Sequence, residues 1–228
     1  MPPDIRVISS MATRRLLADL VARFESASSR QVHVESVGGV DAAKRVKADE
    51  AFDVVVLAAN AIDDLIAAGK VVGSRIDIVK SGVAIAVRAG APRPDIGSEE
   101  AIKKAVIAAR TLGYSTGPSG VQLAKLFERW GIAEQIKNRI VQAPPGVPVG
   151  TLVARGEVEL GFQQLSELMN LQGIDVLGPL PPAIQIITTF SGGVATTSTQ
   201  PEAARTLLAF MTSTEVGKIK QANGMEAI

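Results

Sequence analysis

The stretch that most constrains the fold is residues 5–24, IRVISSMATRRLLADLVARF. It reads as a short strand with β-branched residues, followed by a turn and a helix whose leucines recur at helical spacing. Ser9 and Ser10 lie in the turn, where small polar residues suit a helix start. Such a turn places hydroxyls and free backbone N–H groups at the positive end of a helix dipole, which suits an anion. An ordinary helix cap is the alternative when the turn is considered alone.

The same alternation of strand and helix continues along the chain. Residues 31–37 and 52–57 read as strands, and residues 42–49 and 62–68 as helices, the first of them capped by Asp41. The run FDVVVL is continuously apolar, which is typical of a strand buried on both faces of a parallel sheet. The order β-α-β-α-β-α therefore predicts a parallel sheet with helical crossovers.

A turn-rich segment, GAPRP at residues 90–94, follows a strand at 81–88 and marks the passage into a second domain. Strand-like and helix-like segments alternate again up to about residue 182. Two strand-like segments, 184–189 and 193–197, return the chain to the first domain. We expect an α/β protein of two lobes, the first formed by 1–82 with 193–228 and the second by 83–192.

Composition excludes several classes of function. Lys plus Arg number 24 against 23 for Asp plus Glu, without a basic block, so neither a nucleic-acid nor an anionic-membrane footprint is predicted. Aromatic residues make up only 4%, which argues against stacking platforms. The chain has no cysteine and one histidine, His33, so thiol catalysis and a histidine-rich metal site are excluded, and no cofactor is expected.

The first residues, MPPDIRV, lack the basic and apolar regions of a signal peptide, and no apolar run reaches membrane-spanning length. We therefore expect no membrane insertion, and a cytoplasmic location for the chain as written. A periplasmic location, with an ABC permease as partner, is expected only if a leader has been trimmed.

Four turns share one design, since each follows a predicted strand and precedes a predicted helix. They are Ser9–Ser10, Gly38–Gly39, residues 115–120 and residues 146–150. In open α/β folds the carboxyl edge of the sheet is where ligands bind. Hydroxyls and backbone N–H groups converging there suit a small anion or carboxylate without a full counter-charge. The alternative is that Gly and Ser serve only turn geometry.

Two amides, Gln163 and Gln164, end a strand that otherwise reads as buried, LGFQQ. A glutamine can donate to a ligand oxygen and accept from a hydroxyl, so both are candidate ligand-binding residues. A solvent-facing strand end explains them equally well.

Five segments, in order and spacing, resemble the periplasmic molybdate-binding protein family: VISSMATRRLLADLVARF, FDVVVLAA, TGPSGVQLAKLFERWGI, GEVELGFQQLSEL and TTSTQPEAARTLLAFMTS. The likeness covers nearly the whole chain. It implies the type II periplasmic-binding-protein fold, in which two α/β lobes, each a mainly parallel sheet flanked by helices, close on a ligand in the cleft between them. The SSMAT and GFQQ stretches look more like a branch serving as isomerases of organic acids or enones, such as aconitate isomerase.

The resemblance also implies which positions grip the ligand. The family's two serine loops correspond to Ala12 and to Gly38–Gly39, its tyrosine corresponds to Gln164, and its two backbone amides correspond to Ser119 and to Gly146 or Val147. Three of these five positions depart from the family's pattern, which argues against molybdate or tungstate. The full set of candidate ligand-binding residues is Ser9, Ser10, Met11, Ala12, Gly38, Gly39, Ser115, Ser119, Gly120, Gly146, Val147, Gln163 and Gln164.

Two functions follow from these observations. The first is a solute-binding protein that closes on a small anion, an organic carboxylate rather than molybdate. The second is a cofactor-independent isomerase, of the aconitate or ketosteroid isomerase type, that shifts a double bond by proton transfer. The isomerase needs a base, for which Asp41 is the nearest candidate to a binding loop. Tyr114, Lys44, Glu35 and His33 are weaker candidates.

Overall fold

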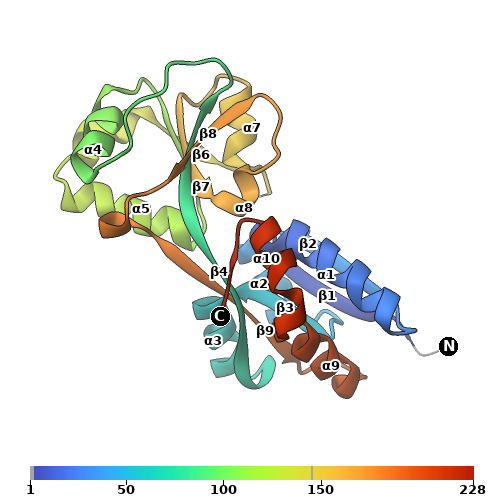
Figure 1. Cartoon of the computed structure of the whole chain (residues 1–228). Helices are drawn as coiled ribbons and strands as arrows, with labels where there is room; N and C mark the ends of the chain where they lie inside the picture. Colours follow the sequence, from blue (N-terminus) through green and yellow to red (C-terminus); the bar gives the residue numbers. More distant parts are fainter. Residues whose placement is uncertain (1–2, 145) are drawn as a thin grey trace. The chain divides into compact units, whose positions relative to one another are not determined.

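The computed structural model of the chain describes residues 3–144 and 146–228 (Figure 1). These residues form two compact units. Unit 1 contains the residues up to Ser81 and those from Thr188 onward, and unit 2 is Gly82–Ile187. The chain passes between the units inside two long strands, β4 (Val71–Arg88) and β9 (Ile187–Ala195). Residues 1 and 2, which open the first predicted lobe, lie outside the described residues.

Unit 1 follows the predicted alternation of strands and helices and ends in two helices and a short strand. Its elements besides parts of β4 and β9 are β1 (Ile5–Ser10), the 3-10 helix η1 (Met11–Thr13), α1 (Arg14–Ala27), β2 (Val32–Val37), α2 (Gly39–Lys47), β3 (Val54–Ala58), α3 (Ala59–Ala67), α9 (Pro201–Thr212), η4 (Thr214–Val216), α10 (Gly217–Ala222) and β10 (Glu226–Ala227). The strand order is β2-β1-β3-β9-β4, with β10 antiparallel to β4. β1 is parallel to both β2 and β3, as predicted, and β9 is antiparallel to β3.

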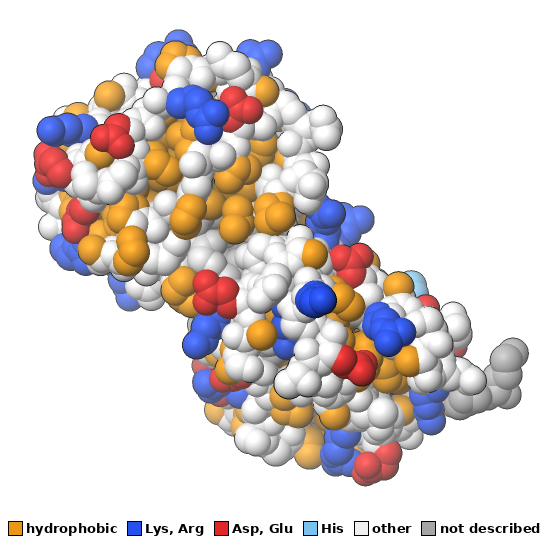
Figure 2. Space-filling model, in the orientation of Figure 1, with side chains coloured by type: hydrophobic (Ala, Val, Ile, Leu, Met, Phe, Trp, Pro, Cys, Tyr) orange, Lys and Arg blue, Asp and Glu red, His pale blue; other side chains and the backbone are white. Residues whose placement is uncertain are grey.

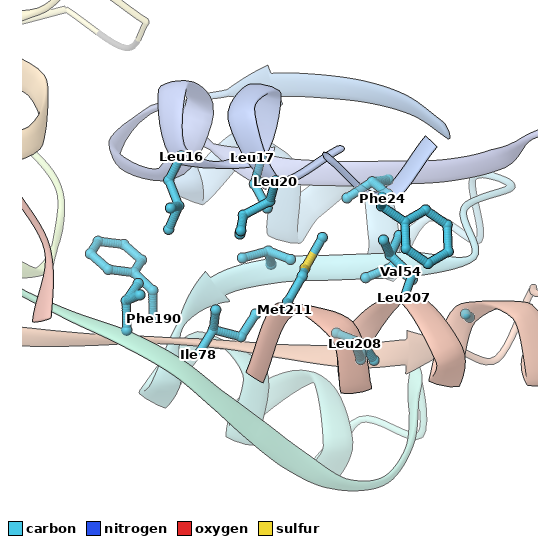
Figure 3. Packing of buried hydrophobic residues seen from close by; sticks show 14 of the residues in the cluster. Leu16, Leu17, Leu20, Phe24, Val54, Ile78, Phe190, Leu207, Leu208 and Met211 are labelled. Carbon is cyan, nitrogen blue, oxygen red and sulfur yellow. The ribbon is translucent and has the colours of Figure 1, made fainter. Parts of the chain in front are cut away.

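Strand β3 lies at the centre of this sheet and is buried along its whole length. Val54 and Val56 pack with α1 and α9 on one face, where Phe24 and Met211 meet them (Figure 3). The alternate residues of β3 pack with α2 and α3 on the other face. Side chains of a strand point alternately to its two faces, so this apolar run needs helices on both sides. The prediction of a strand buried on both faces is confirmed.

Unit 2 contains a second sheet with helices on both faces. Its elements besides the rest of β4 and the first residue of β9 are α4 (Glu99–Ala108), β5 (Leu112–Ser115), α5 (Pro118–Arg129), α6 (Ala133–Ile136), η2 (Lys137–Arg139), β6 (Ile140–Ala143), α7 (Val149–Ala154), β7 (Leu160–Gln164), α8 (Leu165–Leu168), β8 (Ile174–Pro179) and η3 (Pro182–Ile184). β5 is parallel to β6 and β7, and β4 is antiparallel to β7 and β8. The largest core cluster joins α4, α5 and α6 to this sheet, and smaller clusters lie around α7 and α8.

Two predicted boundaries are wrong, each for a local reason. Helix α2 begins at Gly39, so Gly38 is its N-cap and Asp41 belongs to its first turn instead of capping it. The segments expected at 184–189 and 193–197 are one strand, β9, through Gly192 and Gly193. These glycines read as a break, yet a Cβ on either would lie about 2.5 Å or less from a side-chain carbon of Leu208 or Val71. Glycine is needed at both positions because a side chain of α9 and a side chain of β4 occupy the space that a Cβ would take.

Gly120 sets how closely the start of α5 approaches the end of β5. A Cβ built on Gly120 would lie 1.8 Å from the carbonyl oxygen of Ser115, which is a backbone atom. We therefore expect Gly120→Ala to lower the free energy of unfolding by at least about 1–3 kcal/mol, because the helix start must move away from the strand. Urea unfolding followed by circular dichroism measures the change.

Gly217 provides the matched control. It has helical backbone angles, φ −56° and ψ −42°, and a Cβ there meets nothing within 4 Å. Gly217→Ala should leave stability unchanged or raise it by up to about 1 kcal/mol. Equal destabilisation by both substitutions would contradict the role assigned to Gly120.

Candidate functional site

The predicted ligand-binding residues fall into two groups, one in each unit. In unit 1 they lie where the parallel strands β1 and β2 end, with Ser10 opposite Val37 in the register. Helix η1 follows β1 directly, and Gly38 joins β2 to α2. The carboxyl ends of parallel strands meet at one edge of the sheet, so the first two predicted turns lie together.

The two serines at the end of β1 differ in their surroundings. Ser9 is fully buried, and its hydroxyl lies 2.7 Å from the hydroxyl of Ser36. Ser10 is 7% exposed, and among the described residues its Oγ has no hydrogen-bond partner. A Cβ on Gly39 would lie 3.7 Å from the Cβ of Ser10, so this side chain is beside the first residue of α2. A buried hydroxyl without a partner costs about 1–3 kcal/mol, so Ser10 is an unsatisfied polar group at this edge of the sheet.

The N-terminus of α2 adds backbone donors next to Ser10. No side chain among the described residues caps this helix at Gly38. The first N–H groups of a helix have no partner inside it and carry its positive partial charge. Met11 and Ala12, in η1 beside this edge, are both partly exposed. The unit 1 group therefore offers one hydroxyl and a set of amides, without a cation among the predicted residues.

In unit 2 the predicted turn at residues 115–120 leads into the N-terminus of α5. Ser115 ends β5, and its Oγ accepts a hydrogen bond from the N–H of Gly117 at 3.4 Å. Pro118 is the first helical residue, so the first amides of α5 belong to Ser119 and Gly120, which are both buried residues. As in α2, no side chain among the residues described caps the helix.

The loop before α7 uses part of its hydrogen-bonding capacity internally. The N–H of Val147 donates to the carbonyl of Pro144 at 3.0 Å, closing a turn in which Gly146 has φ +77°. Residue 145 of this predicted loop lies outside the described residues. The N–H of Gly150, in the first turn of α7, donates to Oε1 of Gln163 at 3.4 Å.

Gln163 and Gln164 at the end of β7 are 3% and 2% exposed. A solvent-facing strand end is therefore the wrong explanation for these two amides. Gln163 accepts from Gly150 and donates its Nε2 hydrogen to Oε1 of Glu167 at 2.8 Å. Its carboxamide links the first turn of α7 to the first turn of α8.

Glu167 is the functional candidate that the sequence reasoning missed. The residue keeps part of its surface exposed, but its carboxyl is largely withdrawn from water. Burial raises the pKa of the Glu167 carboxyl to about 7, and the hydrogen bond from Gln163 opposes that rise. The available signal was a single acidic residue in the otherwise uncharged stretch LGFQQLSELM, four positions after Gln163.

The other candidate bases are placed less favourably. The Asp41 carboxylate is exposed and lies 3.9 Å from the Lys44 ammonium. The Glu35 carboxylate is held by Arg45, with Nη2 to Oε2 at 2.9 Å, and this hydrogen bond keeps its pKa below the ordinary value. His33 is exposed on β2. Burial raises the pKa of Tyr114, whose ring packs edge-to-face on a phenylalanine.

Charged side chains of both signs are interspersed over the face seen in Figure 2. In the described ranges, 3–144 and 146–228, no three His, Cys, Asp or Glu side chains are grouped as a metal site. No described helix combines the length and apolar character needed to cross a membrane.

The chain matches known proteins along nearly its whole length. The profile of the bacterial extracellular solute-binding protein family matches residues 5–226. The chain is 36% identical to an aconitate isomerase from Pseudomonas sp over 98% of its own length and 88% of that protein.

Solved structures show the fold. The periplasmic molybdate-binding protein of Azotobacter vinelandii superposes with a TM-score of 0.81 at 18% identity, over 99% of this chain and all of that one. The sulfate-binding protein SubI from Mycobacterium tuberculosis gives 0.80 at 16% identity, over 100% and 88%. The predicted α/β periplasmic-binding-protein fold is confirmed, and the chain belongs to the bacterial extracellular solute-binding protein family.

Proposed function

We propose that this protein binds a small organic anion through its carboxylate groups. The observation that carries the proposal is the Ser10 hydroxyl, buried without a partner beside the uncapped N-terminus of α2. A carboxylate oxygen can accept from this hydroxyl and from helix amides together, and charge-assisted bonds of this kind are the stronger ones. The uncapped start of α5 gives unit 2 comparable donors.

Two arguments favour an organic carboxylate over molybdate or tungstate. The positions that the family resemblance implies for side-chain hydroxyls hold Ala12, Gly38–Gly39 and Gln164, so a tetrahedral oxyanion would lose most of its side-chain donors. In addition, the relative that is 36% identical along nearly the whole chain is named for its action on aconitate, an organic carboxylate.

That relative also supports a second candidate function, an isomerase that shifts a double bond in the bound acid. In the alternative role of a transport receptor, the chain would deliver its ligand to an ABC permease, as solute-binding proteins do, and would act outside the cytoplasm. The isomerase and the transport receptor would use the same binding residues. They differ in whether a proton of the bound acid is transferred from one carbon to another. We propose that the two compact units are the two lobes expected from the sequence.

Thermal denaturation with a panel of anions distinguishes the ligand classes. A ligand that binds only the folded state adds about 2.7 kcal/mol at 100 times its Kd and raises the Tm with concentration. We expect trans-aconitate, cis-aconitate and tricarballylate to raise the Tm, and molybdate, tungstate and sulfate to leave it unchanged. Stabilisation by the metal oxyanions alone would overturn the carboxylate proposal.

Ser10→Ala should change affinity and stability in opposite directions. Removing an unpartnered buried hydroxyl should raise the free energy of unfolding by up to about 1 kcal/mol, while loss of a charge-assisted bond should weaken tricarballylate binding about tenfold or more. Ser9→Ala is the matched control. It removes the hydrogen-bond partner of the Ser36 hydroxyl, so it should lower the free energy of unfolding and have little effect on the affinity for tricarballylate. Calorimetric titration and urea unfolding measure the two quantities.

The same titration tests the donors of unit 2. Ser119→Pro removes an amide from the first turn of α5, whereas Ser119→Ala keeps it. Weaker tricarballylate binding in the proline variant alone would assign that amide to the ligand. Unchanged affinity in both variants would remove α5 from the binding site.

Proton NMR of the wild-type protein with trans-aconitate tests the isomerase role. We expect cis-aconitate to form, with deuterium entering the carbon skeleton when the solvent is D2O, because the proton passes through a group that exchanges with solvent. Binding without isomerisation, confirmed by the Tm shift in the same sample, would leave the transport role as the function.

A further inference from the structure

A hydrogen-bonded chain of three groups joins three elements of unit 2. The N–H of Gly150 donates to Oε1 of Gln163 at 3.4 Å, and Nε2 of Gln163 donates to Oε1 of Glu167 at 2.8 Å. These residues come from α7, β7 and α8, at the edge of the sheet where α5 and α7 also begin. Gln163 is thus engaged on both sides of its carboxamide, and its NH2 is directed at the carboxyl of Glu167.

The elements packed around α8 contain few charged residues. Helix α7 (Val149–Ala154) and strand β7 (Leu160–Gln164) contain none, and β4 contributes Ala84 and Ala86. Strand β8 also packs there and carries Asp175, whose carboxylate accepts a hydrogen bond from the N–H of Gly90 at 3.3 Å. Burial and the Gln163 bond account for the raised pKa of about 7, without any charged neighbour contributing. Near neutral pH the carboxyl is therefore poised between its two protonation states.

Packing alone does not account for a carboxyl at this position. Withdrawing a carboxylate from water is unfavourable unless an opposite charge or several hydrogen bonds compensate, and the Glu167 carboxyl accepts a hydrogen bond from a neutral amide, that of Gln163. A glutamine would fill the same volume at lower cost. A carboxyl that keeps part of its surface exposed and titrates near neutral pH is instead suited to proton transfer.

We propose that Glu167 is the acid–base group of the isomerase and that Gln163 positions it, an inference that rests on the proposed isomerase function. The Glu167 carboxylate takes a proton from the saturated carbon that lies between a carboxylate and the double bond of the ligand. The C–H electron pair forms a new double bond to the adjacent carbon. The π electrons of the former double bond move toward the carboxylate at its far end, which becomes an enolate.

The protonated Glu167 then returns the proton to the carbon at the far end of the three-carbon system. One C–H bond breaks and one forms, the double bond moves by one position, and neither an oxidant nor a co-reactant is needed. Within unit 2, the amides at the start of α5 are donors available for the carboxylates of the ligand. Return of the proton to the carbon it left regenerates the substrate.

The test compares the wild type with Glu167→Gln and Gln163→Leu, using trans-aconitate as the probe from pH 5.5 to 8.5. The wild-type rate should rise with pH and level off above about 7, as the base loses its proton. Glu167→Gln should lower the rate at least about 100-fold, the usual contribution of general acid–base catalysis, and should abolish deuterium incorporation. It should retain the Tm shift with tricarballylate, which has no double bond to move.

Gln163→Leu provides the readout that separates positioning from a structural effect. Without the Gln163 donor the carboxylate form of Glu167 is less favoured, so the midpoint of the rate profile should move to higher pH. A uniform loss of rate at every pH, with the midpoint unchanged, would overturn the positioning role. Wild-type rates in Glu167→Gln would overturn the assignment of Glu167 while leaving the isomerase function in place.

Urea unfolding tests the site independently of any ligand. The folded pKa of Glu167 lies above its unfolded value, so the wild type should lose stability as pH rises from about 4.5 to about 7, and Glu167→Gln should not. The urea midpoint of the variant should exceed that of the wild type increasingly up to pH 7. A pH-independent difference would overturn the proposed environment, and a wild type that binds but does not isomerise trans-aconitate would overturn the isomerase function and this assignment together.

Discussion

The amides at the start of a helix need hydrogen-bond acceptors, and in the described part of the chain α2 and α5, which follow parallel strands, begin without a side-chain cap, as do α3, α7 and α8. Gly38 precedes α2 and Gly117 precedes α5, so neither N-cap residue can supply an acceptor oxygen from a side chain. A cap would add stability of about 0.5–2 kcal/mol to each helix, but it would occupy the donors that an anion needs. The strand-to-helix turns thus keep their donors available, and the parallel strands bring those turns to one edge of each sheet.

Two side chains near these turns also carry polar groups whose hydrogen-bonding capacity the protein does not fill. Ser10 buries a hydroxyl that has no partner among the described residues, and Glu167 buries a carboxyl that accepts a hydrogen bond from the neutral amide of Gln163. Both arrangements lower the stability of the empty protein relative to an apolar residue or an amide at the same place. In the proposed function each position has a separate role: the Ser10 hydroxyl offers a hydrogen-bond donor to an anion, and the Glu167 carboxyl exchanges a proton. The large apolar cores of the two units stabilise the fold and offset the unfavourable free energy of these two positions.

Sequence patterns predicted the parts of the fold that local chemistry controls. The run 52–57 indicated a strand buried on both faces, and the strand lies there as predicted. The places of the predicted turns at the sheet edges could be inferred because strand-turn-helix order fixes which residues follow the carboxyl ends of the strands. The break predicted at Gly192–Gly193 was wrong. Glycine is needed at these two positions because the side chains of Leu208 and Val71, which are distant in sequence, occupy the space that a Cβ would take.

Glu167 shows why acid–base groups are harder to find from sequence than binding loops. Its pKa depends on burial by elements packed around α8 and on the direction in which the Gln163 amide points. Neither can be read from residue spacing, so the exposed Asp41, near a predicted loop, was the more obvious choice. A useful sequence criterion follows: one acidic residue in the first turn after a buried strand that ends in amides, inside an otherwise uncharged stretch. Such a residue has no nearby cation to hold it as a simple ion pair, and its protonation then responds to whatever ligand approaches.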